Sequence, residues 1–320
     1  MHAALKTTLL AAFAILPAFA QAEPWTYTDG AGETITLEQV PTRIIATEDA
    51  AAALIPLGIR PVGIIGNSLP EDSKALQGLD LAGIEMVGVT HNEIDLEKAA
   101  ILQPDLVIAE YWPLDKEWGG GAAVTGPGSP LRELAPVTGP AQLDSVVGLI
   151  EEYEALAASL GADLSAPAIA EAKAEFERAR DAFSAAAQAK PNLTALAVWA
   201  GNDGLWVAAP EGAAELMDLQ RWGLDFLKTD LNPDSGYWET VSWERSDKYQ
   251  PDIILIDNRV ATNRANAEAK PTWTAIKAAA DGSVGEWPAY WLRNYRAYAG
   301  ELDKLTAVVE AADENLTSEQ

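Results

Sequence analysis

One segment occurs twice in this chain, and the repeat limits what the chain can fold into. Positions 95 to 112 read DLEKAAILQPDLVIAEYW, and positions 242 to 259 read SWERSDKYQPDIILIDNR. Both copies contain a glutamate, Glu97 or Glu244, and a Gln-Pro-Asp tripeptide that precedes an unbroken apolar run. Proline ends a helix, and an apolar run without alternation is typical of a strand covered on both faces. Each copy therefore predicts a helix, a turn and a central strand of a parallel sheet.

Strands and helices alternate on both sides of the repeat. A hairpin around Asp-Gly opens the pattern, and apolar runs bounded by turn residues then predict strands. The expected strands are 43–46, 61–66, 85–89 and 105–110 in the first half, and 193–201, 205–210 and 252–257 in the second. Helical patterns lie between them, as in βαβ units. We expect an α/β fold of two doubly wound βα lobes, with a ligand cleft between the lobes at the carboxyl ends of the strands.

A long helix is expected to join the two lobes. Ile169, Phe176 and Phe183 recur every seven residues on one face of the segment 167–189, which would span roughly 35 Å as a helix. The predicted organisation is an N-terminal lobe at 23–163, an interdomain backbone helix at 164–190 and a C-terminal lobe at 191–320.

The chain begins with a pattern that is typical of a secretory signal peptide. Lys6 precedes an apolar run from Leu9 to Ala20, and small residues follow up to Ala22. We expect residues 1–22 to be removed on export, which predicts a periplasmic protein. There is no cysteine, so we expect neither a lipoprotein anchor nor disulfides.

Composition argues against several classes of function. The formal charge is -26, which disfavours nucleic acid as a partner because phosphate binding relies on clustered cations. His91 is the one histidine after the signal peptide, so neither a multi-histidine nor a thiolate metal site is expected. No nucleophile triad, phosphate loop or dinucleotide fingerprint is recognisable, and we predict no catalytic residues. The alternative hypothesis is a secreted enzyme with the same two-lobed architecture.

Several aromatic and charged residues are candidates for a ligand site because they lie near the predicted strand ends. Aromatic rings in cleft loops suit a bulky, partly apolar ligand, although each ring alone fits core packing equally well. Arg259 follows a strand directly, where its planar guanidinium suits a carboxylate or hydroxamate oxygen. The candidate ligand-binding residues are Glu48, Tyr111, Trp112, Trp118, Trp199, Trp238, Asn258, Arg259, Trp287 and Arg293.

The order of three blocks resembles a known family. RIIATEDAAAALIPLG, DLEKAAILQPDLVIA and VSWERSDKYQPDIILID, with the long helix between the second and third, are similar to blocks of periplasmic binding proteins of the helical-backbone class. These proteins serve ABC importers of ferric siderophores, haem and cobalamin. The resemblance runs from about residue 40 to residue 311. It implies a monomeric receptor, not an enzyme, that holds a solute between its lobes.

The same resemblance implies a membrane partner. Glu97 and Glu244 match the two glutamates, one on each lobe, that dock against arginines of the ABC permease dimer. The alternative is that both are ordinary carboxylates at helix N-termini, where the helix dipole favours them.

The expected ligand is an iron chelate. The sequence has no dense cation cluster, which argues against a highly anionic tris-catecholate and favours a ferric hydroxamate or a mixed hydroxamate-carboxylate siderophore. We therefore expect an Fe(III)-siderophore as cargo and no resident cofactor. Haem and cobalamin remain alternatives. Haem-binding relatives often carry a tyrosine ligand shortly before the first docking glutamate, where this chain has Thr90 and His91, so His91 would contact metal only if the ligand is haem.

Overall fold

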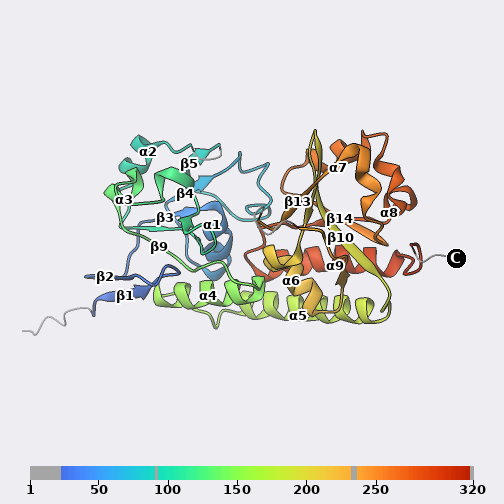
Figure 1. Cartoon of the computed structure of the whole chain (residues 1–320). Coiled ribbons are helices and arrows are strands. Elements are labelled where there is room, and N and C mark those ends of the chain that lie inside the picture. Colours follow the sequence, from blue (N-terminus) through green and yellow to red (C-terminus); the bar gives the residue numbers. More distant parts are fainter. Residues whose placement is uncertain (1–22, 91–92, 232–235, 318–320) are drawn as a thin grey trace, which may run out of the picture.

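The computed structural model describes residues 23–90, 93–231 and 236–317 and shows two α/β lobes above a pair of long helices (Figure 1). The predicted signal peptide at 1–22 and His91 lie outside the described residues. Among the residues that are described, no helix combines the length and apolar character that a bilayer-spanning segment needs.

The N-terminal lobe is built on a five-stranded parallel sheet with the order β5-β4-β3-β6-β9. Its strands are β3 (Ile44–Thr47), β4 (Gly63–Gly66), β5 (Glu85–Val89), β6 (Leu106–Ile108) and β9 (Val137–Thr138), and its helices are α1 (Glu48–Leu54), α2 (Leu96–Ile101), α3 (Pro130–Leu134) and α4 (Val146–Ser159). Two small hairpins, β1 (Trp25–Thr28) with β2 (Thr34–Leu37) and β7 (Tyr111–Trp112) with β8 (Glu117–Trp118), flank it. The strand order reverses between β3 and β6, which is the point where α/β sheets of this kind bind ligands.

The C-terminal lobe has a mixed sheet with the order β13-β11-β10-β14-β15, and β12 also pairs with β10. Its strands are β10 (Thr194–Ala200), β11 (Gly204–Ala208), β12 (Asp225–Phe226), β13 (Trp238–Ser242), β14 (Ile253–Asp257) and β15 (Val284–Trp287). Its helices are α6 (Ala214–Arg221), α7 (Thr262–Glu268), α8 (Lys277–Asp281) and α9 (Tyr295–Ala311).

This second sheet differs from a purely parallel one. β11 runs antiparallel to both β10 and β13. The connection from β10 to β11 has only three residues, 201–203, and a parallel crossover needs a dozen or more. The short Gly-Asn-Asp turn therefore forces a hairpin at this edge, while β10, β14 and β15 keep the parallel order.

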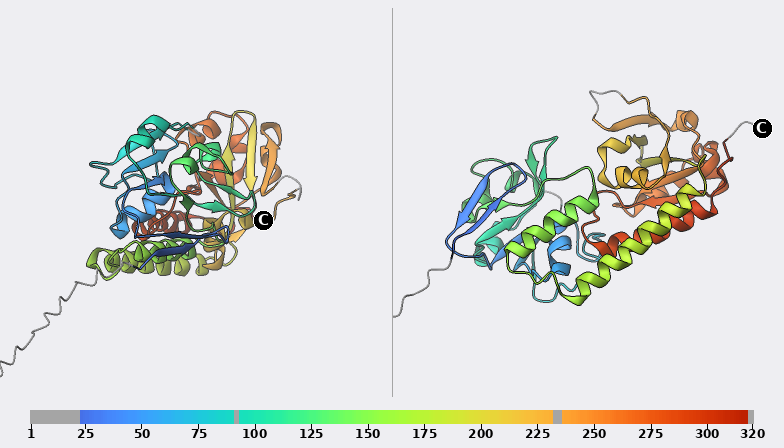
Figure 2. Two further views of the ribbon diagram at one scale, coloured as in Figure 1. Left: turned by 90° about the vertical axis from the view of Figure 1, so that its left-hand side faces the viewer. Right: turned by 90° about the horizontal axis from the view of Figure 1, so that it is seen from below.

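The long helix expected between the lobes is present as α5 (Pro167–Gln188). Ile169, Phe176 and Phe183 are all buried, as the heptad spacing predicts. Ile169 packs in the core of the N-terminal lobe, whereas the two phenylalanines pack in a cluster with the C-terminal lobe. α5 runs alongside α9, as the view from below shows (Figure 2). The helix thus ties the two cores together.

The two copies of the repeat fold alike at the strand and differently at the helix. In the first copy Asp95 caps α2, because its Oδ1 accepts a hydrogen bond from the Lys98 N–H at 2.9 Å. In the second copy the predicted helix is a 3-10 helix, η5 (Trp243–Lys248), interrupted at Arg245. Ser242, which stands where Asp95 stands in the first copy, makes no capping hydrogen bond through its side chain. The Ser242 side chain instead hydrogen-bonds Glu244.

The shared aspartate of the repeat ties neighbouring strands together. Asp105 accepts hydrogen bonds from the N–H groups of Thr42 and Arg43, directly before β3. Asp252 accepts hydrogen bonds from the N–H and hydroxyl of Thr194, at the start of β10, at 2.9 and 2.8 Å. In each lobe the aspartate thus links the strand that follows it to the neighbouring central strand, β6 to β3 and β14 to β10. These hydrogen bonds fix the register of the two strands at their amino ends, opposite the ligand end.

Candidate functional site

A cavity of about 550 Å³ lies between the lobes at the carboxyl ends of the central strands. The N-terminal wall comes from the start of α1, the segment after β4, and β7. The C-terminal wall comes from the end of β10 and from the segments after β14 and β15. The lining residues are Glu48, Asp49, Asn67, Ser68, Asp72, Ser73, Lys74, Ala75 and Trp112 on one side and Trp199, Arg259, Val260, Tyr290 and Trp291 on the other. Polar groups dominate the first wall, and the second combines aromatic rings with one guanidinium.

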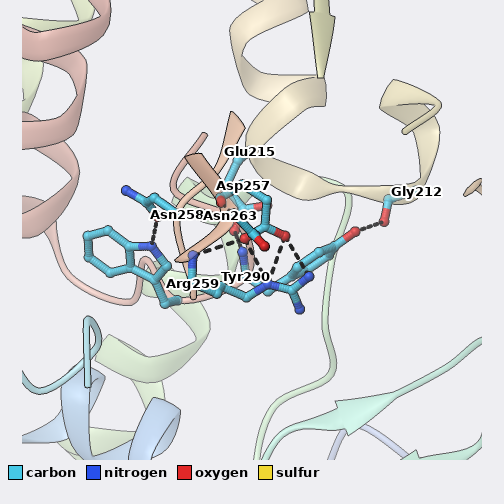
Figure 3. Close-up of polar contacts among 8 residues, drawn as sticks. Gly212, Glu215, Asp257, Asn258, Arg259, Asn263 and Tyr290 are labelled. Atoms are coloured by element: carbon cyan, nitrogen blue, oxygen red, sulfur yellow. Dashed lines mark hydrogen bonds and ion pairs between the residues drawn. The ribbon is translucent and has the colours of Figure 1, made fainter. Parts of the chain in front are cut away.

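Arg259 is the best-defined cation of the cavity. Its guanidinium lies 5.0 Å from the ring centre of Trp199 and 4.7 Å from that of Tyr290. It is also paired with Asp257, whose Oδ2 accepts hydrogen bonds from Nε at 3.0 Å and from Nη2 at 2.6 Å (Figure 3). Burial lowers the pKa of Arg259, but the hydrogen bonds and charge of Asp257 outweigh burial and raise it. The guanidinium is thus fixed in orientation, with one third of the side chain still exposed.

Two asparagines support this wall from behind. The Asn263 side chain donates a hydrogen bond to the backbone carbonyl of Asp257 at 2.9 Å. The Asn258 side chain accepts a hydrogen bond from the indole N–H of Trp291 at 2.8 Å (Figure 3). It donates one to Glu286 at 3.0 Å. Asn258, predicted to contact ligand, is buried and orients Trp291, which lines the cavity.

Glu48 is the matching polar group on the opposite wall. Thr47 caps the helix that begins at Glu48, so the carboxylate lies at the positive end of α1. It accepts hydrogen bonds from the backbone and side-chain N–H groups of Asn67, each at 3.0 Å, and from the Ser73 hydroxyl at 3.4 Å. These contacts hold the carboxylate at the rim of the cavity.

Asp49 follows Glu48 in α1 and has a raised pKa. Burial raises the pKa of Asp49 to about 8, and the charge of Arg293 opposes this shift. The negative charges of Glu110 and Glu48 raise it further. Asp49 is therefore a cavity residue whose charge changes near neutral pH.

Below the cavity a buried ion pair crosses the junction of the lobes. Glu110 follows β6, and Arg293 follows β15 in the other lobe. Arg293 Nη2 donates to Glu110 Oε2 at 2.8 Å, Nε donates to Oε1, and the Tyr153 hydroxyl donates to Oε1 at 3.0 Å. Burial disfavours the charge on Arg293, but the charges of Glu110 and Asp49 raise its pKa. A ring contact between Trp112 and Tyr290, with centres 6.1 Å apart, adds a second bridge.

The structure brings four of the predicted ligand residues together. Glu48, Trp112, Trp199 and Arg259 line the same cavity. Tyr111 and Trp238 lie nearby without lining it: Tyr111 packs on Trp118 with ring centres 5.2 Å apart, and Trp238 packs on Trp287 at 5.7 Å.

Three other predicted positions are corrected, because the structure places them inside the lobes. Trp287 is 0% exposed within the C-terminal core, and Trp118 is 8% exposed in the core of the N-terminal lobe. Arg293, 2% exposed, is held by Glu110 and does not reach the cavity. Their rings and charge stabilise the walls from inside. Trp243 and Trp273 are also buried, in a core cluster of the C-terminal lobe.

Sequence reasoning missed Asp49, Tyr290 and Trp291, together with the segment 67–75. Tyr290 and Trp291 come three and four residues after the last residue of β15, whereas Trp287 is that last residue. The rule that ligand residues follow strand ends would have selected them if β15, where no strand was predicted, had been recognised. The segment 67–75 follows β4, next to the strand at which the order reverses.

The predicted docking glutamates lie on the surface, away from the cavity lining. Glu97 is exposed in the first turn of α2, on the side of the lobe opposite α5 (Figure 1). Glu244 is exposed in η5, and its own backbone N–H and the Ser242 side chain lower its pKa. Among the described residues, no group of three or more His, Cys, Asp or Glu side chains is arranged to hold a metal ion.

Comparisons with solved structures agree with this architecture. The chain is similar to DesE, a ferric-siderophore receptor protein from Streptomyces coelicolor, with 28% identity, a TM-score of 0.81 and coverage of 91% of this chain and 99% of that one. It also shares its fold with the siderophore periplasmic binding protein from the fuscachelin gene cluster of Thermobifida fusca (22% identity, TM-score 0.62, coverage 84% and 96%). FhuD2 from Staphylococcus aureus, solved with bound ferrioxamine B, gives 18% identity, a TM-score of 0.60 and coverage of 84% and 98%. No curated protein matches the sequence.

The family follows from the sequence itself. The model of the periplasmic binding protein family matches residues 45–291, which include the whole repeat, the long helix and both walls of the cavity. This chain therefore belongs to the periplasmic binding protein family.

Proposed function

We propose that this protein is an exported receptor that binds an Fe(III)-siderophore between its lobes and delivers it to an ABC importer. The observation that carries the proposal is the cavity of about 550 Å³, in which Arg259 lies between two aromatic rings and faces a wall of oxygen groups. Rings and a fixed guanidinium suit a bulky chelate that presents oxygen atoms around a metal. Binding without chemistry requires no nucleophile, and we assign none.

The charges of the cavity favour a chelate of low net charge. Arg259 is already matched by the buried Asp257, so it adds little net charge. The carboxylates of Glu48 and Asp72 outnumber the ammonium of Lys74 on the opposite wall. A highly anionic tris-catecholate would be repelled, whereas a ferric hydroxamate or mixed hydroxamate-carboxylate chelate would not. DesE, described as a ferric-siderophore receptor, and FhuD2, solved with bound ferrioxamine B, support a ferric siderophore as the ligand.

The proposed partner is a permease dimer of an ABC importer. Glu97 and Glu244, exposed on different lobes, would each meet an arginine of one permease subunit. A single exposed ion pair contributes little, but two at a fixed separation set the orientation of docking. The proposal includes export by the segment 1–22 and a monomeric receptor without a lipid anchor.

The ligand class is tested with purified protein and a panel of probes. The panel contains ferrioxamine B, a mixed hydroxamate-carboxylate ferric chelate, a ferric tris-catecholate, haem and cobalamin. We expect ferric hydroxamates to quench tryptophan fluorescence, because Trp112, Trp199 and Trp291 line the cavity, and to raise the melting temperature. Recovery of the chelate unchanged would distinguish a receptor from an enzyme.

Two results would overturn parts of the proposal. If no probe changed the fluorescence or the melting temperature of the folded protein, binding of an iron chelate would be refuted. If the tris-catecholate or haem bound more tightly than every hydroxamate, the receptor function would stand and the ligand class would be wrong.

A further inference from the structure

Tyr290 has a backbone conformation that needs an explanation. Its φ is 63°, in the left-handed region that bulky residues rarely adopt. Its ring lines the cavity and lies against the guanidinium of Arg259, 4.7 Å from ring centre to carbon. A strained residue in contact with a binding group persists only where the surroundings hold it. The question is which contacts hold Tyr290.

Two contacts to the region around the start of α6 fix Tyr290. Its backbone N–H donates to Oε1 of Glu215 at 2.8 Å, and its hydroxyl donates to the carbonyl of Gly212 at 3.3 Å (Figure 3). The ring of Tyr237 packs directly against Gly212, where a Cβ would overlap it. The hydrogen bond to Glu215 acts on the strained backbone directly, whereas the hydroxyl contact acts only on the far end of the ring.

Glu215 is a buried carboxyl with one oxygen in use. Its side chain is in the first turn of α6, and the residue is 2% exposed. Oε1 accepts the hydrogen bond from Tyr290, while Oε2 has no hydrogen-bond partner among the residues that the structure describes. Burying a carboxyl oxygen without a hydrogen-bond partner lowers the free energy of unfolding. Its presence here therefore indicates a role that an apolar side chain could not fill.

We propose that Glu215 is a positioning residue for ligand binding: it holds Tyr290 in the left-handed conformation and thereby places Arg259 for the ligand. The inference rests on the proposed function, in which Arg259 contacts the chelate. Glu215 does not line the cavity, and it reaches Arg259 through its hydrogen bond to Tyr290. The contacts run from the Glu215 carboxylate to the Tyr290 N–H, and from the Tyr290 ring to the Arg259 guanidinium.

This arrangement makes the positioning depend on pH. Burial raises the pKa of Glu215 to about 7; the charge of Arg293 and the N–H groups of Glu215 and Tyr290 lower it, and Asp218 raises it. Glu215 also raises the pKa values of Asp49 in α1 and Tyr298 in α9. An ionised carboxylate accepts a stronger hydrogen bond than a protonated carboxyl. Tyr290 should therefore be held more firmly as the pH rises through 7.

The first test needs no ligand. In the full-length protein the amide shift of Tyr290 is followed by NMR between pH 5.5 and 9, in wild type, Glu215→Gln and Glu301→Gln. Glu301 is a buried carboxyl of α9 that contacts Lys304 rather than Tyr290, so its variant is the matched control. We expect a step near pH 7 in wild type and in the control, and none in Glu215→Gln. A step that survives in Glu215→Gln, or a wild type without one, overturns the proposal.

The second test links the positioning to binding. The Kd of ferrioxamine B is measured by fluorescence quenching over the same pH range in an Asp49→Asn background, which removes the cavity carboxyl whose pKa is raised into this range. We expect affinity to rise about three- to tenfold from pH 6 to pH 8 and to stay flat when Glu215→Gln is added. An equal rise with and without Glu215→Gln refutes the positioning role. Absence of binding at every pH counts against the proposed function, and the NMR experiment then decides whether Glu215 holds Tyr290.

Discussion

At the scale of single residues, the aspartate of the Gln-Pro-Asp motif explains why the repeat ends as it does. Proline stops the helix, and the aspartate that follows accepts hydrogen bonds from the residues that open a neighbouring strand. The carboxylate has four acceptor sites, which lets Asp252 also bind the N–H and hydroxyl of Thr317 near the end of the chain. The shared residues of the repeat thus serve sheet assembly as well as the proposed docking.

Replacement of Asp252 by alanine should lower the free energy of unfolding. The side chain is buried and accepts hydrogen bonds from four groups of Thr194 and Thr317. Losing bonds to a charged acceptor and leaving donors unpaired should reduce stability by about 3 kcal/mol in urea unfolding. Asp247→Ala, at an exposed site of the same segment, should change it by less than about 0.5 kcal/mol. Equal effects of both changes would show that the hydrogen bonds of Asp252 with Thr194 and Thr317 do not stabilise the fold.

Replacement of Arg259 by lysine should weaken ligand binding while the fold persists. A lysine ammonium cannot lie flat between the rings of Trp199 and Tyr290 or pair through two nitrogens with Asp257. We expect the Kd of ferrioxamine B to rise about tenfold, measured by fluorescence quenching. Arg264→Lys, whose side chain is exposed on α7 and pairs with Glu268, is the matched control and should bind as wild type does. Unchanged affinity in Arg259→Lys would remove Arg259 from the ligand site.

At the scale of elements, the two copies of the repeat differ in the helix that carries the shared glutamate. α2 is capped by Asp95, whereas η5 is a 3-10 helix in which Ser242 bonds to Glu244. A 3-10 turn is tighter and its hydrogen bonds are poorer, so the two glutamates are presented on different backbones. Both glutamates are exposed, and each follows a strand of its own lobe, β5 for Glu97 and β13 for Glu244.

Reversal of both charges, Glu97→Lys with Glu244→Lys, should abolish iron uptake in cells that depend on this receptor. The side chains are exposed, so the Kd of ferrioxamine B and the melting temperature should stay within error of wild type. Uptake of radioactive iron as the chelate is the measurement. The control changes two other exposed carboxylates of the same two regions, Glu93→Lys with Asp247→Lys, and should retain transport. Normal uptake by the first double variant would contradict docking through these glutamates.

At the scale of the whole molecule, the lobes share more than a linking helix. One apolar cluster contains Ala52 and Ile150 from the N-terminal lobe, Phe176 and Phe183 from α5, and residues of the C-terminal lobe. The buried pair Glu110–Arg293 crosses the same junction. A wide hinge opening would expose this cluster and separate these charges, so we expect small changes in lobe separation on binding.

Loss of one member of the junction pair should cost more stability than loss of both. Glu110→Gln leaves the buried Arg293 without its direct counter-charge and should lower the free energy of unfolding by about 3 kcal/mol. Glu110→Met combined with Arg293→Met replaces the pair by apolar side chains and should recover much of that loss. Urea unfolding at pH 7 measures both. If the double variant is less stable than Glu110→Gln, the ion pair stabilises the junction more than apolar side chains would.

Stability should also fall as pH rises, because of Asp49. Its pKa is raised to about 8 in the folded protein, against about 3.9 when unfolded, so the folded state holds a proton that the unfolded state has lost. The stabilisation is complete below the unfolded pKa and is lost as pH rises through 8. Between pH 6 and pH 8.5, the free energy of unfolding of Asp49→Asn should therefore fall by about 1–2 kcal/mol less than that of wild type, as measured by thermal unfolding. Parallel curves for the two proteins would refute the shift.

The sequence by itself determined the long helix and most of the central strands, namely β3, β4, β5, β6, β10, β11 and β14, whereas β9, β13 and β15 were not predicted. Apolar runs without alternation marked the central strands, the heptad of Ile169, Phe176 and Phe183 marked the buried face of α5, and proline marked the helix ends. These features are local, because hydrophobic periodicity and backbone chemistry act over a few residues. The carboxyl ends of the strands then directed attention to Glu48, Trp112, Trp199 and Arg259, which do line one cavity.

Only the tertiary structure decided which side chains face that cavity. Trp287 and Trp291 are four residues apart, yet the first is fully buried and the second lines the cavity, because the strand ends at the first and the chain turns through the left-handed Tyr290 before the second. Arg293 and Glu110 are 183 positions apart and meet across the junction. Such contacts depend on how the two lobes pack, and local periodicity carries no information about partners so distant in the chain.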